Sequence, residues 1–230
     1  MTRQALPARG IAQAQLAELL EAAGCPLCRH GARSVERFIA SMLWERVSDT
    51  TFRLELVESG GFCDNHTRAV TLADRKQMGG TLGTAILHRA VLEARLTAVE
   101  EARRHRGRSR AKRLAAALVP ARCPACVQRE TAVADALAGL LELAGDPAWS
   151  NAIVETPFCL DHLGRLIAAG GDSRPWLEIE ERQLARLREL TTRLASYVHH
   201  SSHDRRHLLT DAERGAADEA TRTIAGETNG

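Results

Sequence analysis

Residues 25–28 read Cys-Pro-Leu-Cys, and residues 62–66 read Phe-Cys-Asp-Asn-His. The same arrangement recurs as Cys-Pro-Ala-Cys at 123–126 and Phe-Cys-Leu-Asp-His at 158–162, so that all six cysteines of the chain are used. The gaps between each cysteine pair and the following Cys-x2-His are 34 and 32 residues. Three soft thiolates and one imidazole make the tetrahedral shell that zinc prefers, so these stretches predict metal binding.

The repeat continues between the ligand motifs. Residues 49–52 (Asp-Thr-Thr-Phe) match residues 146–149 (Asp-Pro-Ala-Trp), and Glu58 and Glu155 stand at matching positions before the second motif. The chain is therefore predicted to be two homologous halves. Because each half owns a complete ligand set, we expect two zinc ions per chain, one bound within each half: the first by Cys25, Cys28, Cys63 and His66, the second by Cys123, Cys126, Cys159 and His162.

Composition and periodicity predict an all-α protein. Aromatic residues make up only 3% of the 230 residues, and Ala, Leu, Arg and Glu dominate. Apolar positions three and four apart predict amphipathic helices, the longest at residues 82–104 and 175–197. Asp49 and Asp146 are predicted N-caps of a short helix. The expected fold is thus two pseudo-repeated helical halves, each built around a Cys3His site, with long packed helices.

The predicted domain boundaries follow the repeat. Residues 1–102 form the first zinc-binding repeat, 103–113 a basic linker, 114–200 the second repeat and 201–230 a polar C-terminal tail. Within the tail, Thr210 and Glu213 have capping-box spacing, which predicts one more short helix before Gly215.

The net charge of the chain is only +2, but the segment at residues 103–113 is strongly basic. This segment is either a solvated linker or a contact for phosphates, and it contains no aromatic residue that could stack on bases. We expect a protein partner, nucleic acid as a partner of the basic linker, and long helices that pack on each other or, in a homodimer, on a second copy of the chain. The seven cations are Arg103, Arg104, Arg106, Arg108, Arg110, Lys112 and Arg113.

Location is predicted from what the sequence lacks. No apolar run is long enough to span a bilayer, and residues 1–10 have no apolar signal core. We therefore expect a cytoplasmic protein without membrane contact, in a compartment where thiols stay reduced and available to a metal.

Other kinds of chemistry use the same residue types as structural zinc. Cys-Pro-x-Cys also resembles the active-site pairs of glutaredoxin-like proteins, but no strand pattern precedes Cys25 or Cys123. An iron-sulfur cluster with mixed Cys and His ligands, or a metal-dependent or thiol-redox enzyme using one site, is the alternative. His199, His203 and His207 would share one face if the last long helix continued that far, where imidazoles hold transition metals.

The paired motifs resemble a family of bacterial helical proteins of unknown function. The resemblance depends on Cys25, Pro26, Cys28, Gly61, Phe62, Cys63 and His66, and on Cys123, Pro124, Cys126, Phe158, Cys159 and His162. It implies a metal-binding helical fold without implying an activity. The sequence thus predicts a zinc-binding helical scaffold or regulatory adaptor with two structural Cys3His sites.

Overall fold

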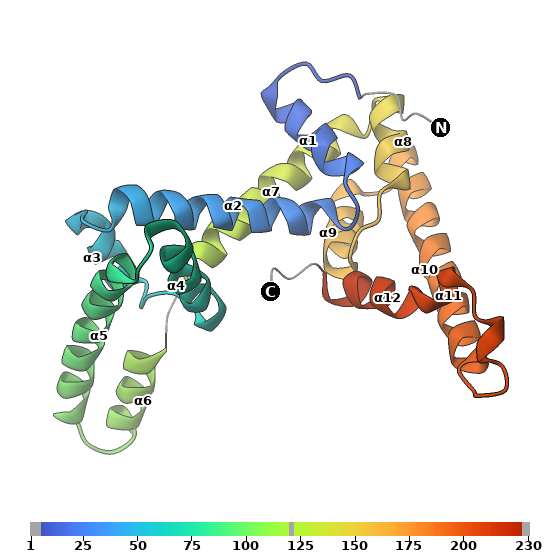
Figure 1. Ribbon diagram of the computed structural model, residues 1–230. Coiled ribbons are helices and arrows are strands. Elements are labelled where there is room, and N and C mark those ends of the chain that lie inside the picture. The colour runs from blue at the N-terminus through green and yellow to red at the C-terminus, as the bar shows by residue number, and fades with distance from the viewer. Residues whose placement is uncertain (1–5, 120–121, 227–230) are drawn as a thin grey trace. The chain divides into compact units, whose positions relative to one another are not determined.

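The structure, a computed structural model, describes residues 6–119 and 122–226. Residues 1–5, 120–121 and 227–230 lie outside the described residues, and the last group belongs to the predicted polar tail. Over the described ranges the chain is helical and contains no strand (Figure 1). The all-α prediction is confirmed.

Backbone contacts divide the chain into two compact units that are not consecutive in the sequence. Unit 1 combines the chain up to Ala32 with the chain from Ala132 onward, and unit 2 is Arg33–Thr131. The boundary falls inside α2 (Pro26–Ser41) and inside α7 (Pro124–Leu143). Each unit therefore contains the beginning of one of these two helices and the end of the other.

Unit 1 packs its helices around one large apolar core. Beside its parts of α2 and α7, it contains α1 (Ile11–Glu21), α8 (Pro147–Glu155), α9 (Leu160–Gly170) and α10 (Arg174–His200). The short η2 (Arg206–Leu208), α11 (Asp211–Arg214) and α12 (Ala216–Ala225) follow. Every long helix contributes to the core, which includes Leu20, Leu27, Leu140, Trp149, Ile153, Leu166 and Ile179, together with Cys25, Cys28 and Cys159.

Unit 2 has its own core. The C-terminal part of α2 continues into a π-helical turn, η1 (Met42–Arg46), and is followed by α3 (Thr50–Glu58), α4 (Asp64–Met78), α5 (Leu82–Arg103) and α6 (Gly107–Leu118). Helices α5 and α6 form a hairpin in which α6 buries no residue completely. The core of unit 2 includes Ile39, Met42, Phe52, Leu56, Val70, Leu87, Cys123 and Ala125.

Local signals in the sequence explain where several helices begin. The backbone N–H of Thr51 donates to the Asp49 carboxylate over 2.8 Å, and the N–H of Ala148 donates to Asp146 over 2.9 Å. Both predicted N-caps are thus confirmed. The capping box at Thr210 also forms and begins α11, whereas α12 follows without having been predicted.

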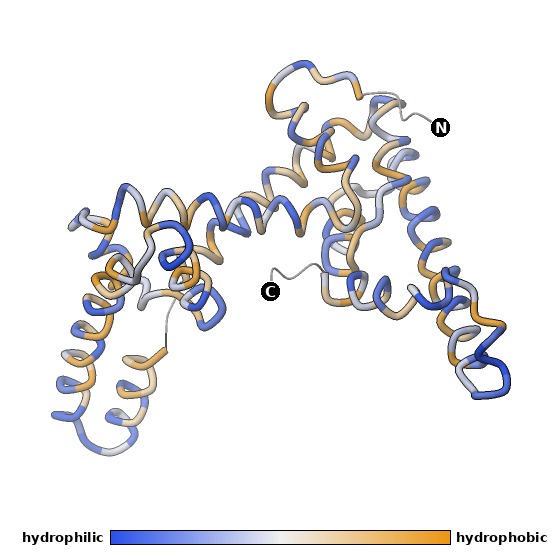
Figure 2. Tube along the Cα trace, viewed as in Figure 1, coloured by the Kyte–Doolittle hydropathy of each residue, from blue (hydrophilic) through white to orange (hydrophobic). Residues whose placement is uncertain are grey.

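The helices are amphipathic. Figure 2 shows apolar and polar residues alternating along most of the helical trace, as expected for helices that bury one face and solvate the other. Among the described helices, none combines the length and the apolar composition that crossing a bilayer requires.

Candidate metal centres

The eight predicted ligands gather into two clusters, each of three cysteines and one histidine. Within each cluster the four ligand atoms lie within 4.8 Å of one another. Centre A, in unit 1, consists of Cys25, Cys28, Cys159 and His162. Centre B, in unit 2, consists of Cys63, His66, Cys123 and Cys126.

The expected pairing within each half is therefore wrong. The Cys-x2-Cys of the first half meets the Cys-x2-His of the second half in centre A, and the opposite pairs meet in centre B. Helix lengths give the physical reason. After Cys28, α2 and η1 carry the chain about 27 Å along their axis, whereas the nine residues of α3 span only about 13 Å. Helix α3 is thus too short by itself to cover the distance back to the first cysteine pair.

All four ligand pairs occupy the same position on a helix. The carbonyl oxygens of Cys25, Cys63, Cys123 and Cys159 each accept the hydrogen bond of the residue four places later, at N–O distances between 2.8 and 3.2 Å. Each of these cysteines thus stands at the N-cap, and the second ligand of each pair follows three residues later on the same face. The N-termini of α2 and α9 converge on centre A, and those of α4 and α7 on centre B.

The spacing of the ligand atoms fits a single tetrahedral ion. With Zn–S bonds of about 2.3 Å and Zn–N bonds of about 2.0–2.1 Å, a regular tetrahedron separates two sulfurs by about 3.8 Å and sulfur from nitrogen by about 3.6 Å. In centre A the Sγ atoms of Cys28 and Cys159 are 3.6 Å apart, and His162 Nδ1 lies 3.2–3.4 Å from the three sulfurs.

Centre B has nearly the same dimensions. The Sγ atoms of Cys63 and Cys126 are 3.7 Å apart. His66 Nδ1 lies 3.2 Å from Cys63 Sγ, 3.5 Å from Cys123 Sγ and 3.3 Å from Cys126 Sγ. All six cysteines are free thiols, so no disulfide competes for these sulfurs. The residues present fit one ion in each centre.

The electrostatics of centre A explain why a cation belongs there. Hydrogen bonds to Cys159 and to Cys28, together with burial, raise the pKa of Cys25 far above its usual range. The hydrogen bonds that Cys159 receives from Cys25 and Cys28 hold the pKa of Cys159 far below that range. Without a metal, therefore, one thiolate forms at the expense of its neighbours. A divalent ion neutralises two of the three negative charges, leaving the centre with three thiolates, one imidazole and a net charge of −1.

In centre A, a proton on His162 competes with a metal ion for the negative charge of the thiolates. Burial alone would lower the pKa of His162, but hydrogen bonds with the thiolates of Cys159 and Cys28 raise it from 6.5 to about 9. A proton on Nδ1 and a metal ion cannot share that nitrogen, so metal binding releases a proton here. On the other side of the ring, Nε2 lies 3.8 Å from a carboxylate oxygen of Asp161, which is also paired with Arg165. This carboxylate favours the ring orientation that directs Nδ1 into the centre.

In centre B, burial and the charge of Cys123 raise the pKa of Cys126 to about 12. The same electrostatic problem, three thiols crowded together, thus exists in both centres. Helix dipoles reduce it in both, because the positive ends of two helices point toward the sulfurs.

Long helices brace the turns that deliver the Cys-x2-His pairs. The side-chain amide of Gln183, on α10, donates to the carbonyls of Val154 and Thr156 over 3.0 and 2.9 Å, just before Cys159. In unit 2 the guanidinium of Arg95, on α5, donates to the carbonyl of Gly60, just before Cys63. Sequence reasoning missed both bracing residues, because neither recurs at a fixed distance from the ligands.

The turn before Cys63 requires glycine. Gly60 and Gly61 have φ of +76° and +89°, and a Cβ on Gly61 would lie 3.0 Å from Val91 Cγ1. In the second half Pro157 occupies the place of Gly61, and Thr156 there is extended, with ψ of 131°. The two halves thus reach the same ligand geometry through different turns.

The histidines near the C-terminus do not form the predicted stack. Helix α10 ends at His200, His203 lies in the following turn, and His207 lies in η2. The guanidinium of Arg205 instead contacts the ring of His199, 2.9 Å from Nε2. The expectation that His199, His203 and His207 share one helix face is therefore wrong.

Comparison with protein-family models, with curated proteins and with solved structures gave no significant match. The geometry of the two centres is thus the principal guide to what the chain does.

Proposed function

We propose that this protein is a zinc-dependent helical scaffold that presents one of its helical hairpins to a partner. The observation that carries the proposal is that each centre supplies four protein ligands, so a tetrahedral ion has no open position for a substrate or water. Sites of this kind are structural. Since the four ligand atoms of each centre surround one point, they fit a single ion better than a multi-iron cluster, whose ligands attach to different metals.

Metal content tests this proposal. Protein purified without added metal is expected to contain two zinc ions per chain and to be colourless. Replacing zinc with cobalt is expected to give the absorption of tetrahedral cobalt with three thiolates and one imidazole. A brown chromophore with stoichiometric iron, or a five- or six-coordinate cobalt spectrum, would contradict the structural-zinc proposal and support the enzyme or iron-sulfur alternative.

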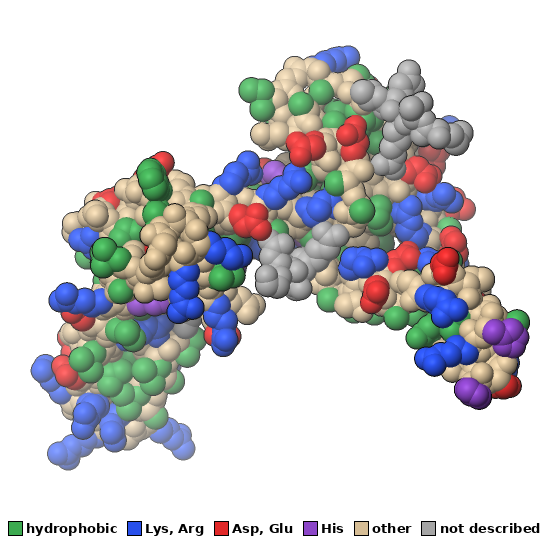
Figure 3. Space-filling model, viewed as in Figure 1, with side chains coloured by type: hydrophobic (Ala, Val, Ile, Leu, Met, Phe, Trp, Pro, Cys, Tyr) green, Lys and Arg blue, Asp and Glu red, His purple; other side chains and the backbone are tan. Residues whose placement is uncertain are grey.

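The α5–α6 hairpin is the surface that we assign to the partner. Leu92 and Leu96, on α5, are 65% and 59% exposed, and Leu118, at the end of α6, is 62% exposed. Figure 3 shows apolar side chains over this hairpin with Lys and Arg side chains gathered around its turn. Apolar side chains next to a basic turn suit a protein partner whose binding surface is apolar and has acidic residues at its edge. A second copy of the chain would be such a partner only if its own acidic residues contacted the basic turn.

Nucleic acid is the second candidate partner of the same hairpin. The predicted linker is a short turn after Arg103 and the first half of α6, and none of its side chains is buried. No aromatic side chain lies among these basic residues to stack on bases, so nucleic-acid binding would be electrostatic and independent of the base sequence. Five substitutions to Gln would then abolish it: Arg103, Arg104, Arg106, Arg108 and Arg110.

A charge-matched variant makes this test specific. It removes five exposed cations that lie outside the hairpin and so lowers the net charge equally. We expect it to bind RNA and DNA like the wild type, measured by fluorescence anisotropy at low salt and across a salt series. Equal loss in both variants, or no binding by the wild type, would leave the protein partner as the proposal. The five control substitutions, each to Gln, are at Arg9, Arg75, Lys76, Arg188 and Arg206.

A further inference from the structure

The two centres differ in how far solvent can reach them. In centre A all four ligand residues are buried: Cys25, Cys28, Cys159 and His162 are 2–4% exposed. In centre B only Cys123, at 7%, is buried, whereas the other three ligand residues are half-buried. The same ligands in the same geometry are thus placed in two environments.

Backbone covers the sulfurs of centre A. Helix α12 ends at Ala225 and is followed by Gly226, which has φ of +74° and is buried. A Cβ at this position would lie 2.9 Å from Cys28 Sγ and 3.6 Å from Cys159 Sγ. Only glycine lets the chain approach two metal ligands so closely. The end of α12 therefore closes centre A on that side.

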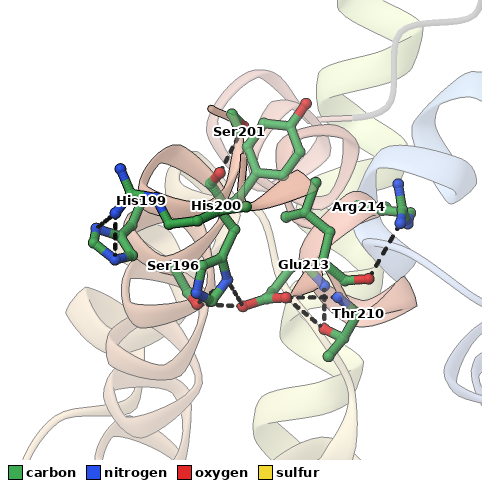
Figure 4. Close-up of polar contacts among 10 residues, drawn as sticks. Ser196, His199, His200, Ser201, Thr210, Glu213 and Arg214 are labelled. Carbon is green, nitrogen blue, oxygen red and sulfur yellow. Dashed lines mark hydrogen bonds and ion pairs between the residues drawn. The ribbon is translucent and has the colours of Figure 1, made fainter. Parts of the chain in front are cut away.

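Polar contacts hold the segment that carries this cover on α10. Glu213 accepts hydrogen bonds from the hydroxyl of Ser196, on α10, and from the backbone N–H and hydroxyl of Thr210 over 2.7 and 2.9 Å (Figure 4). Arg193, on α10, forms a bidentate pair with Glu219, on α12, at 2.7 and 2.9 Å. A small apolar cluster completes the contact and consists of Leu190, Leu194, Ala216 and Ala220.

From these differences we propose that centre B is a metal-exchange site, open to soft ligands such as small thiols, whereas α11 and α12 lock the metal in centre A. The inference rests on the proposed function, because both centres must first bind metal. In centre B the ligand residues Cys63 and Cys126 are half-buried. An incoming thiolate replaces one of them, and the proton lost by the incoming thiol passes to the departing cysteine. The exchange needs neither an oxidant nor a reductant.

Metal release from the full-length protein tests the inference. The two-zinc protein is mixed with a chromogenic chelator in excess, with and without glutathione, and release is followed by absorbance. We expect one equivalent to leave at least about tenfold faster than the other, because opening centre A requires local unfolding of α12. Glutathione should accelerate only the fast equivalent.

Thiol labelling identifies the centre that opens. Brief N-ethylmaleimide pulses during release, followed by peptide mass spectrometry, should modify Cys63, Cys123 and Cys126 in the fast phase. Cys25, Cys28 and Cys159 should react only in the slow phase. Release of both ions with one rate constant, or early labelling of the centre A cysteines, would overturn the inference while leaving two-zinc binding intact. Protein that binds no zinc would instead refute the proposed function.

Variants of α12 test the cover itself. Gly226→Ala should accelerate the slow phase by about tenfold or more, because its Cβ displaces the backbone from Cys28. The matched control is Gly215→Ala, in the same segment, where a Cβ would meet no atom closer than 3.6 Å and φ is −81°. Its slow phase should equal that of the wild type.

Glu219→Gln provides an independent variant that keeps the centre A ligands and Gly226. It weakens the ion pair with Arg193 and should also accelerate the slow phase, even if Gly226→Ala does not fold. If neither Gly226→Ala nor Glu219→Gln, in folded form, changes the rate of the slow phase, α12 does not control zinc release from centre A and the inference is wrong.

Discussion

At the scale of single residues, each centre takes its Cys-x2-Cys from one half of the sequence and its Cys-x2-His from the other. The eight side chains are recognisable in the sequence because thiols and imidazoles recur at fixed spacing, and all eight lie in the two centres. Within-half and crossed pairing use identical residue types, so the motif alone cannot separate them. The long helix after Cys28, about 27 Å before the chain turns, favours the crossed pairing.

Double substitutions distinguish the two pairings directly. Cys28→Ser with Cys159→Ser removes two ligands from centre A, so the protein should keep one zinc ion per chain. Cys28→Ser with Cys63→Ser damages both centres and should leave the protein with none. Zinc content after gel filtration is the measurement. Pairing within each half would reverse the two results, so the opposite outcome would refute the crossed arrangement.

At the scale of elements, local signals in the sequence located the starts of two short helices. Asp49 and Asp146 begin α3 and α8 as predicted, because a carboxylate that accepts backbone N–H groups is a local device. Helix α12 was missed because its reason for forming is tertiary. Ala216 and Ala220 are small, and they are buried only when α10 is present.

Helix α3 offers a matched test of core packing. Leu56 is 1% exposed and Leu54 is 58% exposed on the same helix. Leu56→Ala should lower the free energy of unfolding by about 2–5 kcal/mol through lost burial and a cavity, whereas Leu54→Ala should change it by less than about 0.5 kcal/mol. Urea denaturation of the zinc-loaded proteins measures both. Equal effects would mean that the core of unit 2 is not packed as described.

Docking of α11 should depend on pH through Glu213. Hydrogen bonds from Ser196 and Thr210 lower the pKa of Glu213 from 4.5 to about 2. A lowered acid pKa stabilises the folded state above about pH 4.5, and this stabilisation is lost as the pH falls toward about 2. Glu213→Gln should therefore unfold at lower urea than the wild type at pH 7, and this difference should shrink steadily below pH 4.5.

Glu189→Gln is the control for this prediction. Glu189 is an exposed carboxylate on α10, so its replacement should shift the urea midpoint little at any pH. Zinc content is measured at each pH, and the comparison uses only pH values at which the wild type and the variants keep both ions. A constant difference between wild type and Glu213→Gln from pH 7 to below pH 4.5 within that range would contradict the assigned role of the Glu213 charge.

At the scale of the whole molecule, the sequence predicts two repeats, whereas the compact units do not follow their boundaries. Each unit combines the first part of one predicted repeat with the second part of the other, an exchange like that in a domain-swapped dimer. Chain order conceals such an exchange, because neighbouring motifs in the sequence look like neighbours in space. Only the long helices α2 and α7, which each begin in one unit and end in the other, reveal it.

Removal of the metal should unfold the protein. Structural zinc contributes about 10–16 kcal/mol in small domains, whereas a whole domain is stable by about 5–15 kcal/mol. Ligand cysteines belong to both apolar cores, so neither core keeps its shape without metal. A chelator with a reducing agent should abolish most of the helical circular dichroism, and added zinc should restore it. Metal-free protein with an unchanged melting temperature would refute a structural role.

The crossed pairing also fixes an order of assembly on the ribosome. Unit 2 is one continuous segment, so it can be completed as soon as Thr131 has left the exit tunnel. The two segments of unit 1 precede and follow unit 2 in the sequence, so Cys25 and Cys28 are synthesised before it, whereas His162 and Gly226 come after it. During that interval a cysteine pair stands unpartnered in the nascent chain, exposed to the thiols and metals of its surroundings.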